Sequence, residues 1–176
     1  MTALARPPDE QRWADWHLQH GRAVRGYLLA LVRPPDLADD LVQEVFSRAW
    51  QARQRYREEG NARAYLLRIA DRLACDHGRK SGREVHLSEE GWQQMEPACR
   101  APQAGETLLR QEAVQALTAA LESLSPAQRR VLLMRYYGEL PFAEIARIME
   151  CPLGTVLSHA HRGLLALRKL LVKSEP

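Results

Sequence analysis

The stretch from Leu140 to Lys169 carries hydroxyl, imidazole and guanidinium groups at a spacing that suits hydrogen bonding to nucleic acid. Pro152 can begin a helix there, because proline at the first helical position loses no hydrogen bond. The free backbone N–H groups of a helix N-terminus can hold a phosphate, and side chains at positions 157–162 would reach base edges. The groups available for this chemistry are Gly154, Thr155, Ser158, His159, His161, Arg162, Arg168 and Lys169.

A second basic stretch combines cations with an aromatic ring. Tyr56 lies among arginines, and further basic residues continue as far as Arg83. Bases that have left a duplex stack on ring faces or guanidinium planes, while cations follow the phosphates. This composition therefore suits opened DNA. The cations are Arg53, Arg55, Arg57, Arg63, Arg68, Arg72, Arg79 and Lys80.

Metal binding and catalysis find little support in the spacing of reactive residues. His17 and His20 could share a metal on one helix face, but no carboxylate or cysteine follows at a matching spacing. His159 and His161, two residues apart, would point to different helix faces. No nucleophile elbow, phosphate loop or paired-carboxylate pattern occurs. The sequence predicts neither a metal, nor a cofactor, nor a small-molecule substrate, nor enzyme activity.

Helices are the elements that must position these groups. Phe142, Ile145, Ala146 and Met149 recur at helical spacing after Pro141, so a short helix, a turn and a longer basic helix form a helix-turn-helix. Ser125 is expected to cap the helix over 126–137, and Asp36 is expected to cap the helix that begins there. Trp50 and Tyr65 lie near apolar stripes, which favours core packing for both. The expected helices are 9–32, one from 36, one from about 61, 106–123, 126–137, 141–149 and 153–172.

Charge is strongly segregated along the 176 residues, although the net charge is only +3. Residues 1–47 carry −2 and residues 84–125 carry −5, whereas residues 48–83 carry +6 and residues 126–176 carry +4. Two basic blocks alternating with acidic ones indicate a protein that contacts a polyanion at two places. Three widely spaced cysteines suggest reduced thiols. No apolar run approaches a membrane span, so we expect a cytoplasmic protein without membrane insertion.

The fold expected from these patterns is all-α, with two small helical domains joined by a flexible acidic linker. The first domain spans residues 7–83 and the second, with the helix-turn-helix, spans residues 106–174. The linker, residues 84–105, is rich in glycine, proline and glutamate and has no sustained apolar period.

The segments Asp36–Lys80 and Ala120–Leu171, taken together, resemble bacterial RNA polymerase sigma factors of the extracytoplasmic-function group. The resemblance covers both domains, in the order that this family has, and omits the linker. It implies a factor that binds core RNA polymerase, directs it to the −10 and −35 elements of promoters and helps to open the duplex. It also implies an anti-sigma protein as a second partner.

The resemblance assigns roles to three groups of residues. Docking on the polymerase falls to Asp39, Asp40, Gln43, Glu44, Ser47 and Arg48. Contact with the −10 element, both melted and double-stranded, falls to Arg55, Tyr56, Arg57, Asn61, Arg63, Arg68, Arg72, Asp76, Arg79 and Lys80. Contact with the −35 element falls to Gly154, Thr155, Leu157, Ser158, His159, His161 and Arg162.

The chain departs from the family at several of these positions. Leu157 and His159 stand where a lysine and an arginine are usual, which implies weaker binding. Glu150 occupies a turn position that often holds glycine, and a positive φ there would cost about 1 kcal/mol. From the residues alone, two alternatives stay open: a dimeric helix-turn-helix regulator whose N-terminal domain senses a ligand or dimerises, and a protein-binding adaptor or decoy.

Overall fold

The structure, a computed structural model, describes residues 8–53, 61–81 and 115–172. The expected acidic linker lies outside these residues, as do three of the candidate −10 contacts, Arg55, Tyr56 and Arg57. Every regular element within the described ranges is helical. This agrees with the predicted all-α class.

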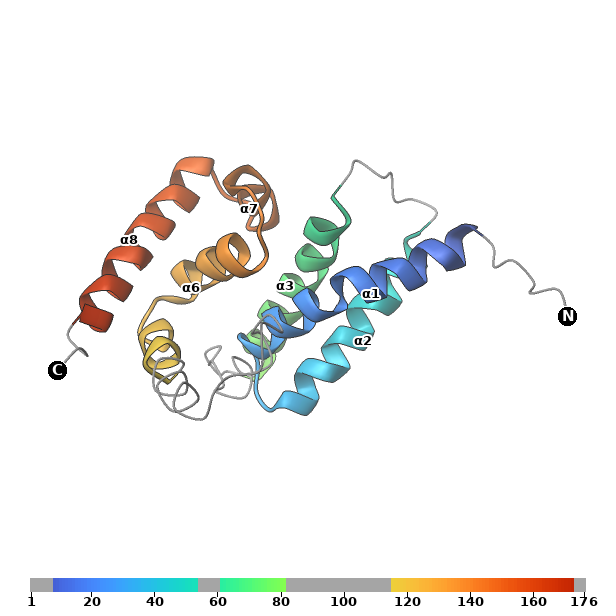
Figure 1. The fold of residues 1–176 in the computed structure, drawn as a ribbon, viewed down its shortest axis with the longest axis horizontal. Coiled ribbons are helices and arrows are strands. Elements are labelled where there is room, and N and C mark those ends of the chain that lie inside the picture. Colours follow the sequence, from blue (N-terminus) through green and yellow to red (C-terminus); the bar gives the residue numbers. More distant parts are fainter. Residues whose placement is uncertain (1–7, 54–60, 82–114, 173–176) are drawn as a thin grey trace, which may run out of the picture.

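Three helices form the N-terminal unit, residues 8–81. They are α1 (Pro8–Leu29), α2 (Pro35–Gln51) and α3 (Ala62–Ser81), and each packs against the other two (Figure 1). Their shared interior includes Val24, Leu28, Val45 and Leu66, all of which are fully buried. Helix α1 ends at Leu29, three residues before the predicted end and ahead of the prolines that cannot continue it.

The C-terminal unit, residues 115–172, is also helical throughout. A helix over 115–122 precedes α6 (Pro126–Leu132), the π-helical turn η1 (Leu133–Tyr137), α7 (Phe142–Ile148) and α8 (Leu153–Val172). Sequence periodicity predicts one α-helix over 126–137. The observed helix instead widens at η1, where the Gly138 N–H donates to the Leu133 carbonyl at 2.8 Å.

The N-caps of α2 and α6 can be compared with the capping residues predicted from the sequence. Ser125 caps α6 as predicted, and Gln128 closes a reciprocal capping box with it. The prediction for Asp36 is wrong: Pro34 is the N-cap of α2, and Asp36 lies in the first turn. Pro141 and Pro152 each stand one residue before their helix, so their carbonyls accept its first hydrogen bonds.

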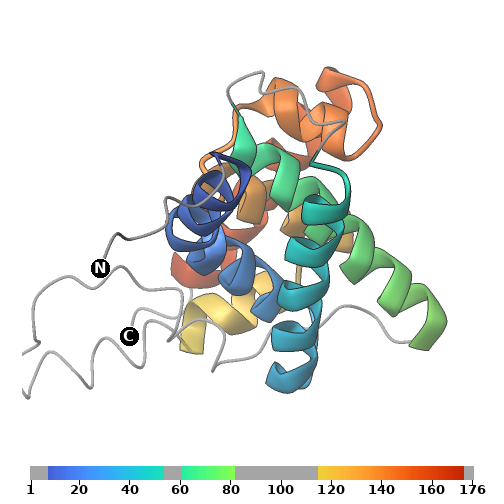
Figure 2. The same cartoon turned by 90° about the vertical axis from the view of Figure 1, so that its right-hand side faces the viewer.

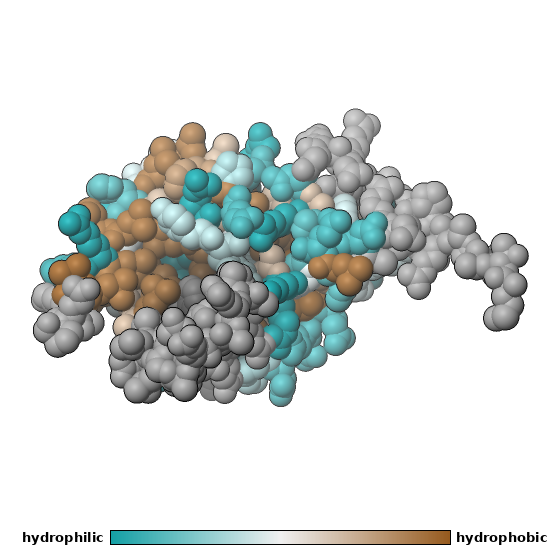
Figure 3. Space-filling model, in the orientation of Figure 1, coloured by the Kyte–Doolittle hydropathy of each residue, from teal (hydrophilic) through white to brown (hydrophobic). Residues whose placement is uncertain are grey.

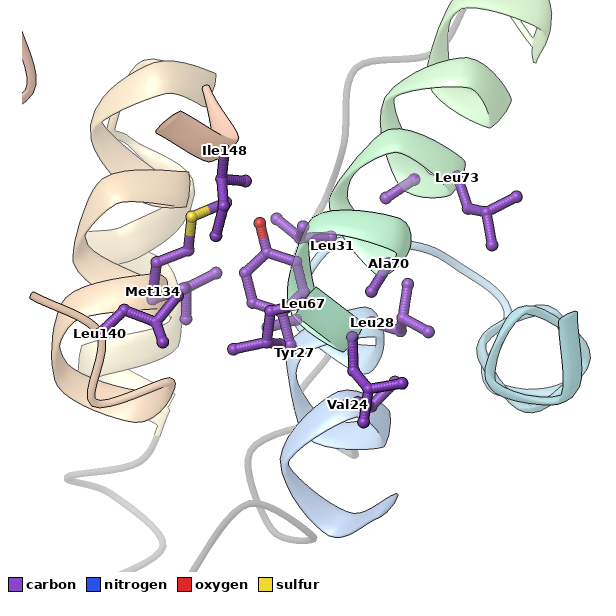
Figure 4. Packing of buried hydrophobic residues seen from close by; sticks show 14 of the residues in the cluster. Val24, Tyr27, Leu28, Leu31, Leu67, Ala70, Leu73, Met134, Leu140 and Ile148 are labelled. Atoms are coloured by element: carbon purple, nitrogen blue, oxygen red, sulfur yellow. The ribbon is translucent and has the colours of Figure 1, made fainter. Parts of the chain in front are cut away.

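One apolar core runs through both units, which the sequence did not predict. Leu67 and Ala70 of α3, Tyr27 of α1 and Leu31, which follows α1, face Met134, Leu140 and Ile148 of the C-terminal unit (Figure 4). Helix α7 lies beside α3 in both Figure 1 and Figure 2. The two basic segments that the sequence separates by an acidic connector are therefore brought together.

The turn between η1 and α7 allows this close approach. A Cβ at Gly138 would meet Leu67 Cδ1 at 2.9 Å and the Met134 carbonyl oxygen at 2.7 Å, so glycine is required there. Glu139, the next residue, has a φ of 56°, and Glu150 has a φ of 53°. The positive φ considered for Glu150 is therefore present, and each glutamate carries a backbone cost of about 1 kcal/mol.

Candidate nucleic-acid interface

Helix α8 is held by one face and presents the others to solvent. Val156, Ala160 and Gly163, three to four residues apart, are buried. A Cβ at Gly163 would meet Leu132 Cδ1 at 3.0 Å, which shows how closely α6 and α8 approach. The candidate −35 residues that this packing leaves exposed are Gly154, Thr155, Leu157, Ser158, His161 and Arg162.

In the described part of the chain, the hydrogen bonds made by side chains of this face stay within the helix itself. The Ser158 hydroxyl donates to the Gly154 carbonyl at 2.8 Å, and Arg162 Nε donates to the Ser158 carbonyl at 3.2 Å. Among the described residues, no acidic side chain pairs with Arg162. His159 is half-buried, and its Nδ1 has no hydrogen-bond partner in the described part of the chain. The exposed groups of this face are therefore available to an external ligand, whereas the buried His159 Nδ1 is not.

Helix α7 and the following turn fix the direction of α8. Ile145 and Ile148 are buried, and the Cys151 N–H donates to the Ala146 carbonyl at 3.1 Å across the turn. Positive φ at Glu150 reverses the chain between the two helices. The predicted helix-turn-helix is thus present, with its second helix exposed along the side that would enter a groove.

The candidate −10 residues on α3 lie in three different environments. Arg68, Arg72, Arg79 and Lys80 are exposed. Arg79 pairs with Asp76 one turn earlier, and this hydrogen bond lowers the pKa of the Asp76 carboxyl. Asn61 caps the helix, since its Oδ1 accepts from the Ala64 N–H at 3.0 Å.

Two arginines of this surface pair with glutamates of the C-terminal unit. Arg63 Nη1 donates to Glu139, and Arg72 Nη2 donates to Glu150. Arg63 is the more enclosed of the two, and its Nε is buried without a partner in the described residues. Burial lowers the pKa of nearby His20, and the positive charge of Arg63 lowers it further.

Aromatic rings support the base of the same surface. Trp50 and Tyr65 are half-buried, and their ring centroids lie 5.4 Å from Trp13 and 6.2 Å from Trp16, respectively. The core packing predicted for Tyr65 is therefore confirmed, whereas Trp50 lies outside the core of the described residues and contacts Trp13. The Arg53 guanidinium covers the outer face of Trp50 at 4.2 Å.

The candidate polymerase-docking residues on α2 include side chains that are paired within the protein and side chains that are exposed. Asp39 accepts two hydrogen bonds from Arg25 of α1, at 2.6 and 3.0 Å, so it holds α1 against α2. Glu44 pairs with Arg48 along the helix at 2.6 Å. The exposed members of the set are Asp40, Gln43, Ser47 and Arg48.

Sequence reasoning missed a buried polar cluster between the two units. Asp71 of α3, which is 2% exposed, accepts from the Tyr27 hydroxyl at 2.7 Å and from both Nε and Nη2 of Arg130 on α6. Burial and the Asp71 carboxylate raise the Tyr27 pKa well above its ordinary value. The available signal was a carboxylate within the apolar stripe of α3, one turn after Leu67.

The described residues contain no group of three potential metal ligands. The His17 ring lies 4.4 Å from the Phe46 ring, and it does not gather carboxylates or thiols around it in this part of the chain. None of the helices in the described ranges has the length and apolar character needed to cross a bilayer.

Comparison with known families matches both units. The family described as sigma-70 region 2 matches residues 17–84, and the family described as sigma-70, region 4 matches residues 114–167. The RNA polymerase sigma factor CarQ of Myxococcus xanthus is 30% identical over 166 residues, covering 94% of this chain and 92% of CarQ. The ECF RNA polymerase sigma factor SigK of Mycolicibacterium vanbaalenii is 26% identical, covering 93% of this chain and 83% of SigK.

Two solved structures share the fold. One is the sigma factor RpoE in complex with the anti-sigma factor NepR from Bartonella quintana, with a TM-score of 0.73, 23% identity, and coverage of 94% of this chain and 99% of RpoE. The other is CnrH in complex with the cytosolic domain of CnrY, with a TM-score of 0.65, 20% identity, and coverage of 94% of this chain and 91% of CnrH. Their arrangement of helices extends over nearly the whole chain.

Proposed function

Because the chain belongs to the sigma-70 family, in the extracytoplasmic-function group, and directs transcription initiation, we propose that its two units divide promoter recognition between them. Residues 7–83 bind core RNA polymerase and the −10 element. Residues 106–174 bind the −35 element, and residues 84–105 connect the two domains. The observation that carries this proposal is the exposed outer face of α8, whose inner face is buried by α6 and α7.

Helix α8 reads duplex DNA in the major groove. Its first turn meets a phosphate through free N–H groups and Thr155, and the open space around Gly154 lets the DNA backbone approach. Leu157 and Ser158 reach base edges, and a leucine in place of a cation favours contact with a thymine methyl group. The residues of this site are Gly154, Thr155, Leu157, Ser158, His159, His161 and Arg162.

The N-terminal unit performs polymerase docking and duplex opening. On α2 the exposed side chains that would meet a partner are Asp40, Gln43, Ser47 and Arg48. Arg48 is also paired with Glu44, and Asp39 is paired with Arg25 of α1. Arg68 and Lys80 track phosphates at the upstream edge of the −10 element. The full −10 set is Arg55, Tyr56, Arg57, Asn61, Arg63, Arg68, Arg72, Asp76, Arg79 and Lys80.

An anti-sigma protein is the second macromolecular partner that we propose. RpoE, which shares this fold, was solved with the anti-sigma factor NepR, and CnrH was solved with the cytosolic domain of CnrY. Exposed leucines and a valine gather over α8 (Figure 3), and covering them would remove apolar surface from water. As a factor acting on polymerase and DNA, the protein works in the cytoplasm by binding alone, without catalysing a reaction.

In-vitro transcription with purified core polymerase and a promoter library tests this function. We expect start sites that depend on the protein and that share upstream motifs. Arg162→Glu should abolish this initiation, because it places an anion against the duplex. Arg168→Glu is the comparison variant and should reduce initiation much less, since Arg168 lies about 9 Å further along α8, on another face and outside the proposed −35 set. Specific binding to palindromic duplex without polymerase-dependent initiation would overturn the proposal.

A further inference from the structure

We propose that the packing of the C-terminal unit on α3 is an autoinhibited form, in which Glu139 and Glu150 occupy Arg63 and Arg72 in place of DNA phosphates. The inference rests on the −10 role proposed above for the two arginines. Separation of the units at the contact between Asp71 and Arg130 releases them. The C-terminal unit thus acts on the N-terminal unit as an internal substitute for nucleic acid.

The buried cluster around Asp71 holds the closed form together. It joins three helices, because Tyr27 belongs to α1, Asp71 to α3 and Arg130 to α6. Both carboxylate oxygens are used, and Arg130 donates in the bidentate arrangement that gives strong, directional pairing. An unpaired carboxylate at such a buried position is strongly unfavourable, so the contact between the units is made as a whole or lost as a whole.

Apolar packing around the cluster adds to its hold. Leu67 and Tyr27 meet Met134 and Leu140 across the boundary between the units, and all four are 2% exposed or less (Figure 4). Gly138 permits this approach, because any side chain there would collide with Leu67. Such burial resembles a domain interior rather than a transient surface contact, and the free chain therefore stays closed.

The two glutamate pairs have a different role. The side chains of Arg72 and Glu150 are 59% and 68% exposed, and Glu139 is similarly exposed, so these pairs contribute little to stability. Their effect is to neutralise two cations of the −10 surface. A carboxylate offers the same kind of acceptor to a guanidinium as a phosphate does.

Backbone conformation singles out the same two glutamates. Among the described non-glycine residues, only Glu139 and Glu150 have positive φ, and each places its carboxylate on an arginine of α3. Glycine would fit both backbones with less strain. Strained residues that persist at a contact point to a role for their side chains, and here that role is to cover the DNA-binding arginines.

The closed form affects the two DNA surfaces differently. In it, Arg162 on α8 has no acidic partner among the described residues, whereas Arg63 and Arg72 on α3 each have one. The free protein would therefore bind duplex through α8 and bind single strands only weakly. Docking on core polymerase, which must hold the two units at two separate promoter elements, opens the chain.

The first experiment measures binding of a fluorescent single-stranded oligonucleotide to the full chain without polymerase. Glu139→Gln combined with Glu150→Gln should tighten binding about 10-fold. The slope of log K against log salt should steepen by about 1.4, as expected for two newly available phosphate contacts on a single strand. The matched control is Asp36→Asn with Glu144→Gln, which changes the net charge equally and leaves both contacts between the units intact. Equal affinity and slope in the two double variants would overturn the inference.

A second measurement follows the opening itself. Small-angle scattering should give a larger radius of gyration for Arg130→Gln than for the wild type, with helix content unchanged by circular dichroism. If Arg130→Gln loses helix content, Arg130→Lys provides a milder form of the same test, because an ammonium keeps the charge but cannot make the bidentate contact with both Asp71 oxygens. An unchanged radius in a folded variant that binds single strands no better than the wild type would contradict the autoinhibited form.

Transcription with core polymerase separates this inference from the function on which it rests. Arg72→Ala should lower initiation if the arginine contacts the −10 element. A normal rate with Arg72→Ala would reject that role, whatever scattering shows about closure. Reduced initiation with Arg72→Ala, together with no gain of single-strand binding in the glutamate double variant, would retain the −10 role and reject autoinhibition.

Discussion

The two helices that we propose to contact DNA, α3 and α8, are both basic but are presented in opposite ways. Helix α8 buries one face against its own unit and leaves the groups of its reading face exposed. Helix α3 packs against both units, and two of its arginines pair with glutamates of the other unit. Positive charge in a sequence therefore indicates only the potential for DNA binding, because tertiary pairing decides which cations are available.

The two helices should therefore bind DNA in a fixed order, α8 before α3. A surface that is already exposed can bind duplex as soon as the protein meets it, whereas a paired surface must first be released. This order suits a factor whose contact with melted DNA is useful only on the polymerase. Changes that alter the contact between the units should therefore affect α3 and spare α8.

The largest effect is expected from Arg130→Met, which leaves the Asp71 carboxylate buried without its cation. The free energy of opening at the contact between the units should fall by about 3–5 kcal/mol. Denaturant unfolding of the variant and the wild type measures the difference. Arg162→Met is the control, since the loss of an exposed arginine should change stability by less than about 0.5 kcal/mol.

The double variant Asp71→Asn with Arg130→Met tests the cause of that loss. It removes the buried charge together with its partner, so much of the lost free energy should return. A double variant as unstable as Arg130→Met alone would show that packing of the arginine stem, rather than the unpaired carboxylate, dominates.

A smaller effect should distinguish the two helices in DNA binding by the free protein. Arg162→Ala should weaken duplex binding by about 1–3 kcal/mol, because the arginine is exposed and belongs to the −35 surface that we propose. Arg72→Ala should leave binding by the free protein nearly unchanged, because Glu150 already neutralises that arginine. Fluorescence anisotropy with a promoter duplex measures both, and Arg168→Ala controls for the loss of one charge. Equal losses for the two variants would remove the distinction between the helices.

Local sequence patterns predicted most of the individual helices and the helix-turn-helix. Ser125 as a cap, the apolar stripe of α2 and the exposed face of α8 depend on residues within a few positions of one another, and such patterns can be read along the chain. Asp36 failed as a cap because two prolines before it already fix the backbone at the helix start. At this helix start, the backbone preference of the two prolines outweighed the capping preference of the aspartate side chain.

Contacts between distant segments could not be predicted in this way. Asp71 and Arg130 are 59 residues apart, and Arg72 and Glu150 are 78 apart, with a charged connector between the units. A single sequence gives no measure of which acid meets which base at such separations. The candidate site was therefore predicted as a set of residues, while the state of each residue, paired or available, came only from the tertiary structure.

Glu150→Gly should have a modest effect on stability and a clearer one on α3. Glycine relieves a positive φ that costs about 1 kcal/mol, while an exposed ion pair worth up to about 1 kcal/mol is lost, so the melting temperature should rise slightly or stay level. Glu150→Ala keeps the backbone cost and loses the same pair, so it should melt below Glu150→Gly. Differential scanning calorimetry compares the two. The same melting temperature for both would show that this turn is not strained.

The smallest expected effect is a pH dependence of stability caused by His20, which lies near Arg63. Burial and the charge of Arg63 lower the pKa of His20 below its ordinary 6.5, so the folded chain binds the proton less readily than the unfolded chain does. Stability from this residue is therefore complete above pH 6.5 and is lost as the pH falls from 6.5 through the lower, folded-state pKa. The melting temperature of the wild type should fall more than that of His20→Gln over this interval. An NMR titration of the His20 ring should also show a rise in pKa in Arg63→Gln, because one of the two causes is removed while burial remains. An unchanged pKa in that variant would mean that Arg63 does not act on His20, and that burial alone sets its titration.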